Sequence, residues 1–189
     1  MTKIESERLV LYPLEDCELR QCAELETNEE LKKAYHEMLQ GCLEHPQQRI
    51  WYTLWNIELK NDAGTIVGDL GFKGLDENGM VEIGYGLREG FCKKGYMTEA
   101  VKTICQWALE QKGVTRIEAE TTVDNRDSQR VLSLAGFVPT GECGNEGPRF
   151  VYLFCDAIRK AFEVLDYGPT GSGYDLKKKY LIDGEIRYL

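Results

Sequence analysis

A glycine beside two lysines, placed just before a helical pattern, is the clearest candidate for chemistry in this sequence. Lys93, Lys94 and Gly95 follow an alternating apolar segment and precede apolar residues at helical spacing. The first N–H groups of a helix lack intrahelical partners and carry partial positive charge, so they bind phosphate groups readily. Gly95 would let the backbone approach such a ligand, and the lysines would add charge. The segment is therefore a candidate phosphate site, although an ordinary strand–turn–helix unit has the same pattern.

Hydrophobic periodicity predicts the elements that would position this turn. Alternate residues of 81–87 are apolar, which predicts a strand. After the turn, apolar residues return every three or four positions and predict a helix. Residues 116–123 predict a second strand, which is followed by the polar segment 124–130 and by the pair Gly136-Phe137. The buried face of the helix would consist of Met97, Val101, Ile104, Cys105 and Ala108.

This ordered series resembles the GNAT superfamily of acyl-CoA-dependent N-acyltransferases, in particular its RimJ/RimL-like branch. The family motif Q/R-x-x-G-x-G/A falls on residues 92–97, and the later Asn-x-x-Ser falls on residues 125–128. Segments 6–14 and 66–72 resemble the first and third strands of the branch, so the resemblance covers about residues 4–155. The sequence departs from the motif at Cys92, where the family usually has Gln or Arg, and at Met97, where it has Gly or Ala.

The resemblance implies acetyl-CoA as the acyl donor, seated between two neighbouring strands that splay apart, here 81–87 and 116–123. Backbone groups of the first strand would contact the pantetheine arm and the acyl carbonyl, from Gly84, Tyr85, Gly86 and Leu87. Backbone N–H groups would hold the pyrophosphate, from Lys93, Lys94, Gly95, Tyr96, Met97 and Thr98. Asn125 would contact the cofactor or orient the substrate, and a role as a turn or helix-cap residue is its alternative. No metal is expected.

The implied reaction is the direct attack of a neutral amine on the thioester, which needs a base for the amine proton and an acid for the leaving thiolate. Free amines are mostly protonated at neutral pH, so the base is essential for a lysine-like amine. Glu82 is the first candidate for the base, and Asp69 and Glu120 are alternatives. Many family members have a tyrosine seven residues after the Asn, where this sequence has Leu132. Ser128 occupies the serine position of the branch and is the candidate proton donor, directly or through water, with a role as a first-turn serine that satisfies the helix backbone as its alternative.

The resemblance implies a cytoplasmic N-acetyltransferase that moves an acetyl group from acetyl-CoA to a primary amine in a ternary complex. The acceptor would be a protein N-terminus or a small amine such as a polyamine, an aminoglycoside or an amino acid. Two alternatives stay open: a non-catalytic acyl-CoA-binding or regulatory module, and an interaction domain that does not bind CoA. A homodimer is a further option.

The composition limits the class of partner. A chain of 189 residues suffices for one hydrophobic core. Its 23 Lys and Arg against 32 Asp and Glu give a net charge of −9, which argues against nucleic acid or an anionic membrane as the main partner. No apolar segment could span a bilayer, and residues 1–5 do not read as a secretory signal. Seven cysteines without a Cys-x-x-Cys pair predict neither a disulfide framework nor a zinc site, and most are expected to be buried thiols.

The full pattern predicts a mixed α/β fold with a single GNAT-like domain over residues 1–155. Its twisted, mostly antiparallel sheet would have about seven strands, splayed at the fourth and fifth, with helices on both faces. Two helices are expected near the N-terminus, capped by Asp16 and Asn28. Strands are expected at 7–11, 49–59, 66–72, 81–87, 116–123, 137–142 and 149–155. A C-terminal extension, 156–189, would add a helix, a glycine-rich loop and a hairpin that pack on the same domain or on a partner.

Overall fold

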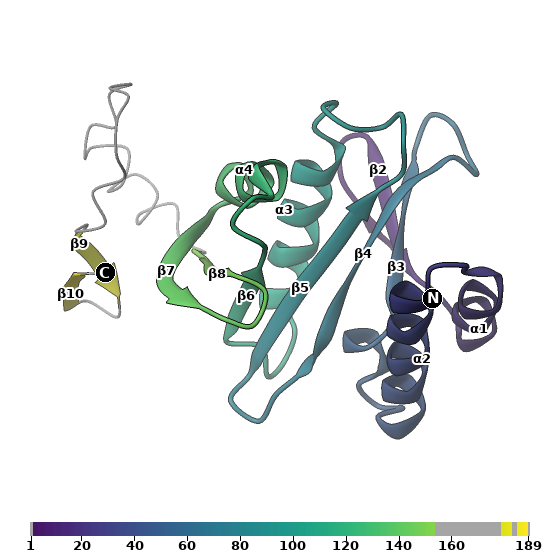
Figure 1. Ribbon diagram of the computed structural model, residues 1–189, viewed down its shortest axis with the longest axis horizontal. Coiled ribbons are helices and arrows are strands. Elements are labelled where there is room, and N and C mark those ends of the chain that lie inside the picture. Colours follow the sequence, from purple (N-terminus) through teal and green to yellow (C-terminus); the bar gives the residue numbers. More distant parts are fainter. Residues whose placement is uncertain (1, 154–178, 183–184, 189) are drawn as a thin grey trace. The chain divides into compact units, whose positions relative to one another are not determined.

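The structure, a computed structural model, describes residues 2–153, 179–182 and 185–188 (Figure 1). In chain order the elements are β1 Ile4–Glu5, β2 Leu9–Pro13, α1 Asp16–Leu25, α2 Glu29–Glu44, the 3₁₀ helix η1 Arg49–Trp51, β3 Leu54–Leu59, β4 Ile66–Leu75, β5 Met80–Leu87, α3 Tyr96–Leu109, β6 Arg116–Glu120, α4 Arg126–Ala135, β7 Phe137–Cys143, β8 Pro148–Tyr152, β9 Lys179–Ile182 and β10 Glu185–Tyr188. The strand order β1-β2-β3-β4-β5-β6-β8-β7 gives an eight-stranded, mostly antiparallel sheet, which confirms the predicted mixed α/β class. The chain divides into two compact units, Met1–Ala119 and Glu120–Leu189.

In the first unit, α3 packs on one face of the sheet with the apolar stripe that its sequence predicts. Met97, Val101, Ile104, Cys105 and Ala108 are all buried. The same core holds the three tryptophans of the chain, with ring centroids 5.4 Å apart for Trp51 and Trp107 and 5.1 Å apart for Trp55 and Trp107. Buried aromatic rings of this size contribute strongly to a core, so this cluster fixes α3 against the strands.

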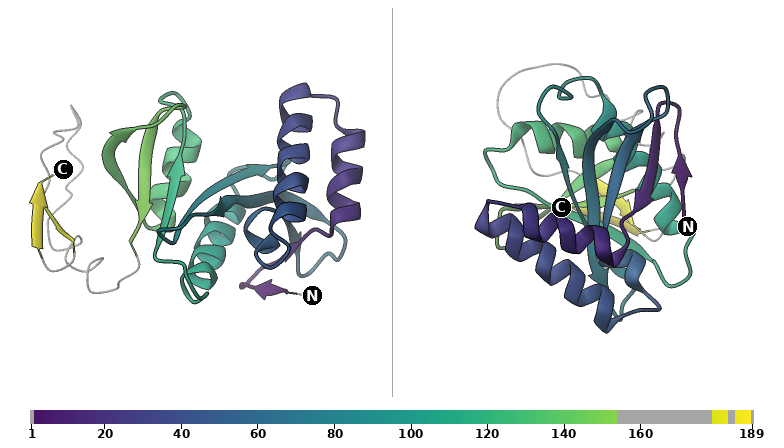
Figure 2. Two further views of the ribbon diagram at one scale, coloured as in Figure 1. Left: turned by 90° about the horizontal axis from the view of Figure 1, so that it is seen from below. Right: turned by 90° about the vertical axis from the view of Figure 1, so that its right-hand side faces the viewer.

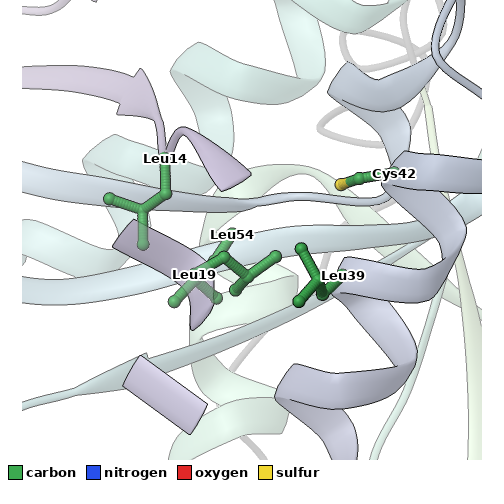
Figure 3. Packing of buried hydrophobic residues seen from close by; sticks show 5 residues of the cluster. All are labelled: Leu14, Leu19, Leu39, Cys42 and Leu54. Atoms are coloured by element: carbon green, nitrogen blue, oxygen red, sulfur yellow. The ribbon is translucent and has the colours of Figure 1, made fainter. Parts of the chain in front are cut away.

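The helices α1 and α2 cover the other face of the same strands (Figure 2). Successive residues of a strand point to opposite faces, so Leu54 of β3 points away from Trp55 and toward these helices. There it joins a small hydrophobic cluster whose members are Leu14, Leu19, Leu39, Cys42 and Leu54 (Figure 3). Helices therefore lie on both faces of the sheet, as the sequence predicts.

The start of α2 follows the prediction and the start of α1 does not. The Asn28 side chain caps α2 by accepting hydrogen bonds from the N–H groups of Glu30 and Leu31, at 2.9 and 3.2 Å. At α1 the prediction of Asp16 as the cap was wrong, because Glu15 forms a capping box with Glu18, whose side chain accepts from the Glu15 N–H at 2.7 Å.

Asp16 instead anchors the segment that was wrongly predicted as the start of a strand. Residues 49–51 form η1, and β3 begins only at Leu54. The Arg49 guanidinium donates to the Leu14 carbonyl at 2.9 Å and to the Asp16 carboxylate at 2.6 Å. These contacts hold Arg49 against the start of α1, where it cannot continue the ladder of β3.

In the second unit, β6 ends at Glu120, three residues before the predicted end at Val123. The Gln129 side chain donates to the carbonyls of Thr122 and Val123, at 3.2 and 2.9 Å, and thereby shapes a turn into α4. Gly136, at φ 110°, ends α4 as predicted.

The strands β9 and β10 pair antiparallel at the position of the predicted hairpin. The predicted helix and glycine-rich loop of the C-terminal extension lie outside the described residues, and the domain boundary at residue 155 stays a prediction.

The prediction that most cysteines are buried was wrong for the described part of the chain. Its six cysteines are free thiols, of which Cys42 and Cys105 are buried while Cys17, Cys92 and Cys143 are exposed. Apolar neighbours in the sequence misled the prediction, since Cys17 lies off the buried face of α1 and Cys92 lies in the exposed turn before α3.

Candidate functional site

The strands β5 and β6 are the neighbours between which the sequence predicts a gap. They pair in parallel over residues 80–82 and 116–118. Beyond this point β5 continues along β4, with Gly84 opposite Gly71 and Gly86 opposite Asp69. The predicted pantetheine contacts, residues 84–87, therefore lie where the described pairing of β5 with β6 has ended.

Gly84 and Gly86 leave a bare strip on one face of β5. A Cβ placed on Gly84 would have no neighbouring atom within 4 Å, and on Gly86 it would meet Asp69 Oδ1 at 3.8 Å. Neither glycine has a left-handed backbone, so the conformation of the strand does not require glycine here. A strand without side chains is typical of a place where another chain approaches the backbone closely.

The turn before α3 has the geometry of an anion site. Lys93 and Gly95 are left-handed, at φ 62° and 79°, and Gly95 is the N-cap of α3. Among the described residues, no side chain caps this helix start. Successive backbone N–H groups in such a turn form a concavity that binds anions, and the helix dipole adds to the attraction. Met97 is buried, so its side chain points into the core, as the helical pattern predicted.

Arg8, which sequence reasoning did not single out, holds this turn in place. Its Nη1 donates to the Lys94 carbonyl at 3.0 Å, and its Nε donates to the Glu99 carboxylate at 2.6 Å. The guanidinium also lies 4.7 Å from the ring centre of Tyr96. Arg8 and Glu99 are 91 residues apart in the sequence, so no local pattern could have revealed the pair.

Arg8 and Glu99 together form a clamp on the turn before α3, and Glu99 contributes to it from the start of α3. Its carboxylate accepts hydrogen bonds from Ser6 Oγ and from the Arg8 N–H, both at 2.7 Å. Burial acts to raise the pKa of Glu99, but the hydrogen bonds from Ser6 and Arg8 and the charge of Arg8 outweigh it and lower the pKa. Glu99 is therefore ionised at neutral pH, and it fixes Arg8 by a charge-assisted contact.

The two candidate bases of the first unit lie on one face of the sheet in different surroundings. Glu82 is 13% exposed and its carboxylate forms an ion pair with Lys73 at 2.5 Å. Asp69 lies opposite Gly86, and burial raises its pKa while the charge of Arg88 offsets part of that rise. Asp69 therefore holds its proton more tightly than an ordinary aspartate does.

The remaining candidates belong to the second unit. Glu120 Oε1 accepts hydrogen bonds from the N–H groups of Glu146 and Gly147, at 2.5 and 2.9 Å, so it ties down the loop between β7 and β8. Asn125 caps α4 by accepting from the Ser128 N–H at 3.0 Å, which confirms its role as a helix-cap residue. Leu132 is fully buried, so the position where many family members have a tyrosine is part of the core.

The part of the chain that the structure describes contains no group of three or more His, Cys, Asp or Glu side chains that could hold a metal ion. None of its helices is long and apolar enough to cross a membrane.

Known proteins share both the sequence pattern and the fold. The profile of the acetyltransferase (GNAT) domain matches residues 8–138. The uncharacterized N-acetyltransferase YjdG of Bacillus subtilis is 43% identical over 83 residues, which are 43% of this chain and 49% of that protein. The chain thus spans about half the length of this curated relative.

Solved structures show the same fold at low sequence identity. A variant of the spermidine N-acetyltransferase SpeG from Vibrio cholerae superposes with a TM-score of 0.61 at 16% identity, covering 78% of this chain and 95% of that one. RimL, a ribosomal L7/L12 alpha-N-protein acetyltransferase in complex with coenzyme A, gives 0.59 at 20% identity, covering 79% and 94%. Since the matching profile covers more than half of the sequence, from β2 into β7, the chain belongs to the acetyltransferase (GNAT) domain family.

Proposed function

We propose that this protein is an N-acetyltransferase that moves an acetyl group from acetyl-CoA to a primary amine by direct attack in a ternary complex. The observation that carries the proposal is the turn of residues 93–95. Its backbone is left-handed at Lys93 and Gly95, and no described side chain caps the start of α3 that follows it. In the same unit, this turn follows the bare strip of β5 along the chain. The bare strip and the anion site follow one another along the chain. This arrangement suits a long ligand that carries a phosphate group at one end.

The residues present fit acetyl-CoA. Backbone N–H groups of residues 93–98 would bind the pyrophosphate, helped by the charges of Lys93 and Lys94. Residues 84–87 would contact the pantetheine arm and the acyl carbonyl, and Asn125 would make a further contact. Acetyl-CoA supplies a thioester, whose carbonyl carbon is open to attack by an amine.

The chain's own residues would then manage the protons. Glu82 or Asp69 would take a proton from the amine, and the new C–N bond would form as the C–S bond breaks. Ser128 would give a proton to the leaving thiolate, directly or through a water molecule. A protein N-terminus and a small amine both fit this scheme, and a homodimer and a cytoplasmic location stay predictions.

Two measurements on the whole chain test the proposal. Calorimetry with acetyl-CoA should show binding, and thioester consumption should rise when amines are added from a panel of N-terminal peptides, polyamines, aminoglycosides and amino acids. Gly95→Asp should weaken acetyl-CoA binding severely, because it places a side chain and a negative charge at the helix start. Gly64→Asp is the matched control, since Gly64 is also left-handed, at φ 87°, but lies in the turn between β3 and β4.

The outcomes separate the candidate functions. Absence of binding at millimolar acetyl-CoA would contradict the proposal and favour an interaction domain that does not bind CoA. Binding without turnover across the panel would favour a non-catalytic acyl-CoA-binding module. If Gly64→Asp weakened acetyl-CoA binding as much as Gly95→Asp does, backbone strain would explain the weaker binding. The turn of residues 93–95 would then not be the pyrophosphate site.

A further inference from the structure

A row of directly opposed residues crosses the sheet on the face that carries α1 and α2. Tyr12 of β2 lies opposite Asn56 of β3, Asn56 opposite Asp69 of β4, and Asp69 opposite Gly86 of β5. Opposed residues of antiparallel strands point to the same face, so the three side chains stand beside one another. The Asn56 amide indeed reaches the Tyr12 hydroxyl at 3.5 Å. The row therefore leads from a polar surface to the bare strip.

Asp69 is the residue of this row whose placement opposes stability. Within the described residues, no N–H or O–H group donates a hydrogen bond to its carboxylate, and burial raises its pKa. Asp69 is partly buried, and a carboxylate that loses part of its hydration without gaining donors destabilises the folded state; such groups are concentrated at functional sites. The side chains that face it electrostatically are Cys22 of α1, Tyr35 of α2 and Arg88 after β5. Arg88 is the one permanent charge among them.

The bare strip gives Asp69 access to a ligand. Its carboxylate is the nearest group to the Cβ that Gly86 lacks, at 3.8 Å, while the position of a Cβ on Gly84 is open to 4 Å. A ligand atom lying over Gly86 would contact the carboxylate directly, and Gly84 leaves room beside it for the rest of the ligand. Glu82 lies on the same face of β5, but its carboxylate is held by Lys73 at 2.5 Å. Lys73 neutralises Glu82 and would compete with an incoming ammonium group.

We propose that Asp69 is the general base of this protein, and that the acceptor reaches it over Gly84 and Gly86 as a primary ammonium ion. This inference rests on the proposed N-acetyltransferase function and names its base and the charge form of its acceptor. Asp69 binds the ammonium group as an ion pair and takes one of its protons. The neutral amine then attacks the thioester carbonyl, and the second proton leaves with the coenzyme A thiolate. The net products are the amide, coenzyme A and one proton, which Asp69 returns to solvent.

The first test compares Asp69→Asn with Glu82→Gln in the full chain, using steady-state kinetics at saturating acetyl-CoA. General-base catalysis contributes ~10²–10⁴-fold, so Asp69→Asn should lower kcat by about 10²-fold while acetyl-CoA affinity stays within about twofold. The acidic limb of the kcat–pH profile should disappear in this variant. Glu82→Gln should have the smaller effect and keep the acidic limb. Asp62→Asn is a matched control, because Asp62 is an exposed carboxylate in the turn between β3 and β4.

The second test needs no substrate and follows from the sign of the pKa shift. A carboxyl whose pKa is raised on folding binds more protons in the folded state, so its charge destabilises the protein as pH rises through the raised value. Asp69→Asn should therefore melt at a higher temperature than the parent chain at neutral pH. The difference should shrink as pH falls through the raised pKa of Asp69 and vanish below the ordinary aspartate pKa of 3.8, where the carboxyl is protonated in both the folded and the unfolded chain.

These results distinguish failure of the inference from failure of the proposed function. If the parent chain consumes no thioester with any amine, both the proposed function and the inference are wrong. If the parent chain turns over and Asp69→Asn keeps its rate and its acidic limb, Asp69 is not the base. A larger loss in Glu82→Gln than in Asp69→Asn would also overturn the inference and restore Glu82. Equal melting temperatures at all pH values would show that Asp69 carries no buried charge.

Discussion

Asn125 and Ser128 form the start of α4, and both are also proposed to take part in the reaction. The cap of α4 uses the Asn125 side chain and the backbone N–H of Ser128, at 3.0 Å. The serine hydroxyl is therefore not the group that starts the helix, and a change at that hydroxyl leaves the cap bond in place. Chemistry and helix stability can be separated at this one residue.

Ser128→Ala should thus lower turnover without unfolding α4. A direct general acid contributes ~10²–10⁴-fold, so kcat should fall toward that range while the acetyl-CoA dissociation constant, measured by calorimetry, stays nearly constant. Ser133→Ala is the matched control, because Ser133 is exposed on the same helix. An unchanged kcat, with the chemical step shown to limit the rate, would reduce Ser128 to a helix-start residue.

Among the elements, α3 depends on a distant arginine for the shape of its first turn. The fork of the Arg8 guanidinium joins the Lys94 carbonyl to the Glu99 carboxylate, at 3.0 and 2.6 Å. A lysine has the same charge but cannot donate in two fixed directions. The geometry of the guanidinium, and not its charge alone, therefore keeps the turn in its left-handed conformation.

Arg8→Lys should weaken acetyl-CoA binding several-fold in calorimetry and lower the unfolding free energy by about 1 kcal/mol, near the lower limit for charged hydrogen bonds because Arg8 is partly exposed. Arg20→Lys, on the exposed side of α1, is the control and should change neither quantity. The idea of a clamp is contradicted if the Arg8 variant binds acetyl-CoA as tightly as the parent chain does.

Sequence reasoning succeeded where a local pattern decides the structure. The stripe of α3 and the Asn28 cap follow from spacing and residue type alone. It failed where a distant contact decides, as at Arg49, which the Leu14 carbonyl and Asp16 hold out of β3. The sequence identified Glu82 and Asp69 as candidate bases. Only the structure shows that Asp69 lies opposite Gly86 and that Lys73 forms an ion pair with Glu82. The choice between the two bases therefore needed the structure.

For the whole molecule, the decisive question is whether its two compact units unfold together. All three tryptophans belong to the first unit, so tryptophan fluorescence reports on that unit alone. Strand β6 belongs to both units, since residues 116–119 fall in the first and Glu120 in the second. The boundary between the units therefore falls inside a continuous strand and not in a linker, which favours a single cooperative transition.

Thermal melting followed by tryptophan fluorescence and by circular dichroism at the helix band should therefore give the same midpoint. Circular dichroism reports on α4 as well as on α1, α2 and α3, so it includes the second unit. The calorimetric and van't Hoff enthalpies should also agree, as for one cooperative domain. Two separated midpoints would show that the second unit unfolds alone and would contradict the predicted single domain.

The row of Tyr12, Asn56 and Asp69 also bears on how this protein can diversify. Each of the three side chains comes from a different strand, and the hydrogen-bonded backbone fixes their spacing. A substitution at Tyr12 or Asn56 would remove the contact between these two side chains at 3.5 Å, but the backbone register that places Asp69 would stay the same. Under the proposal that Asp69 is the base, single substitutions at Tyr12 or Asn56 would let descendants of this chain change the polar side chains beside the base without insertions or deletions.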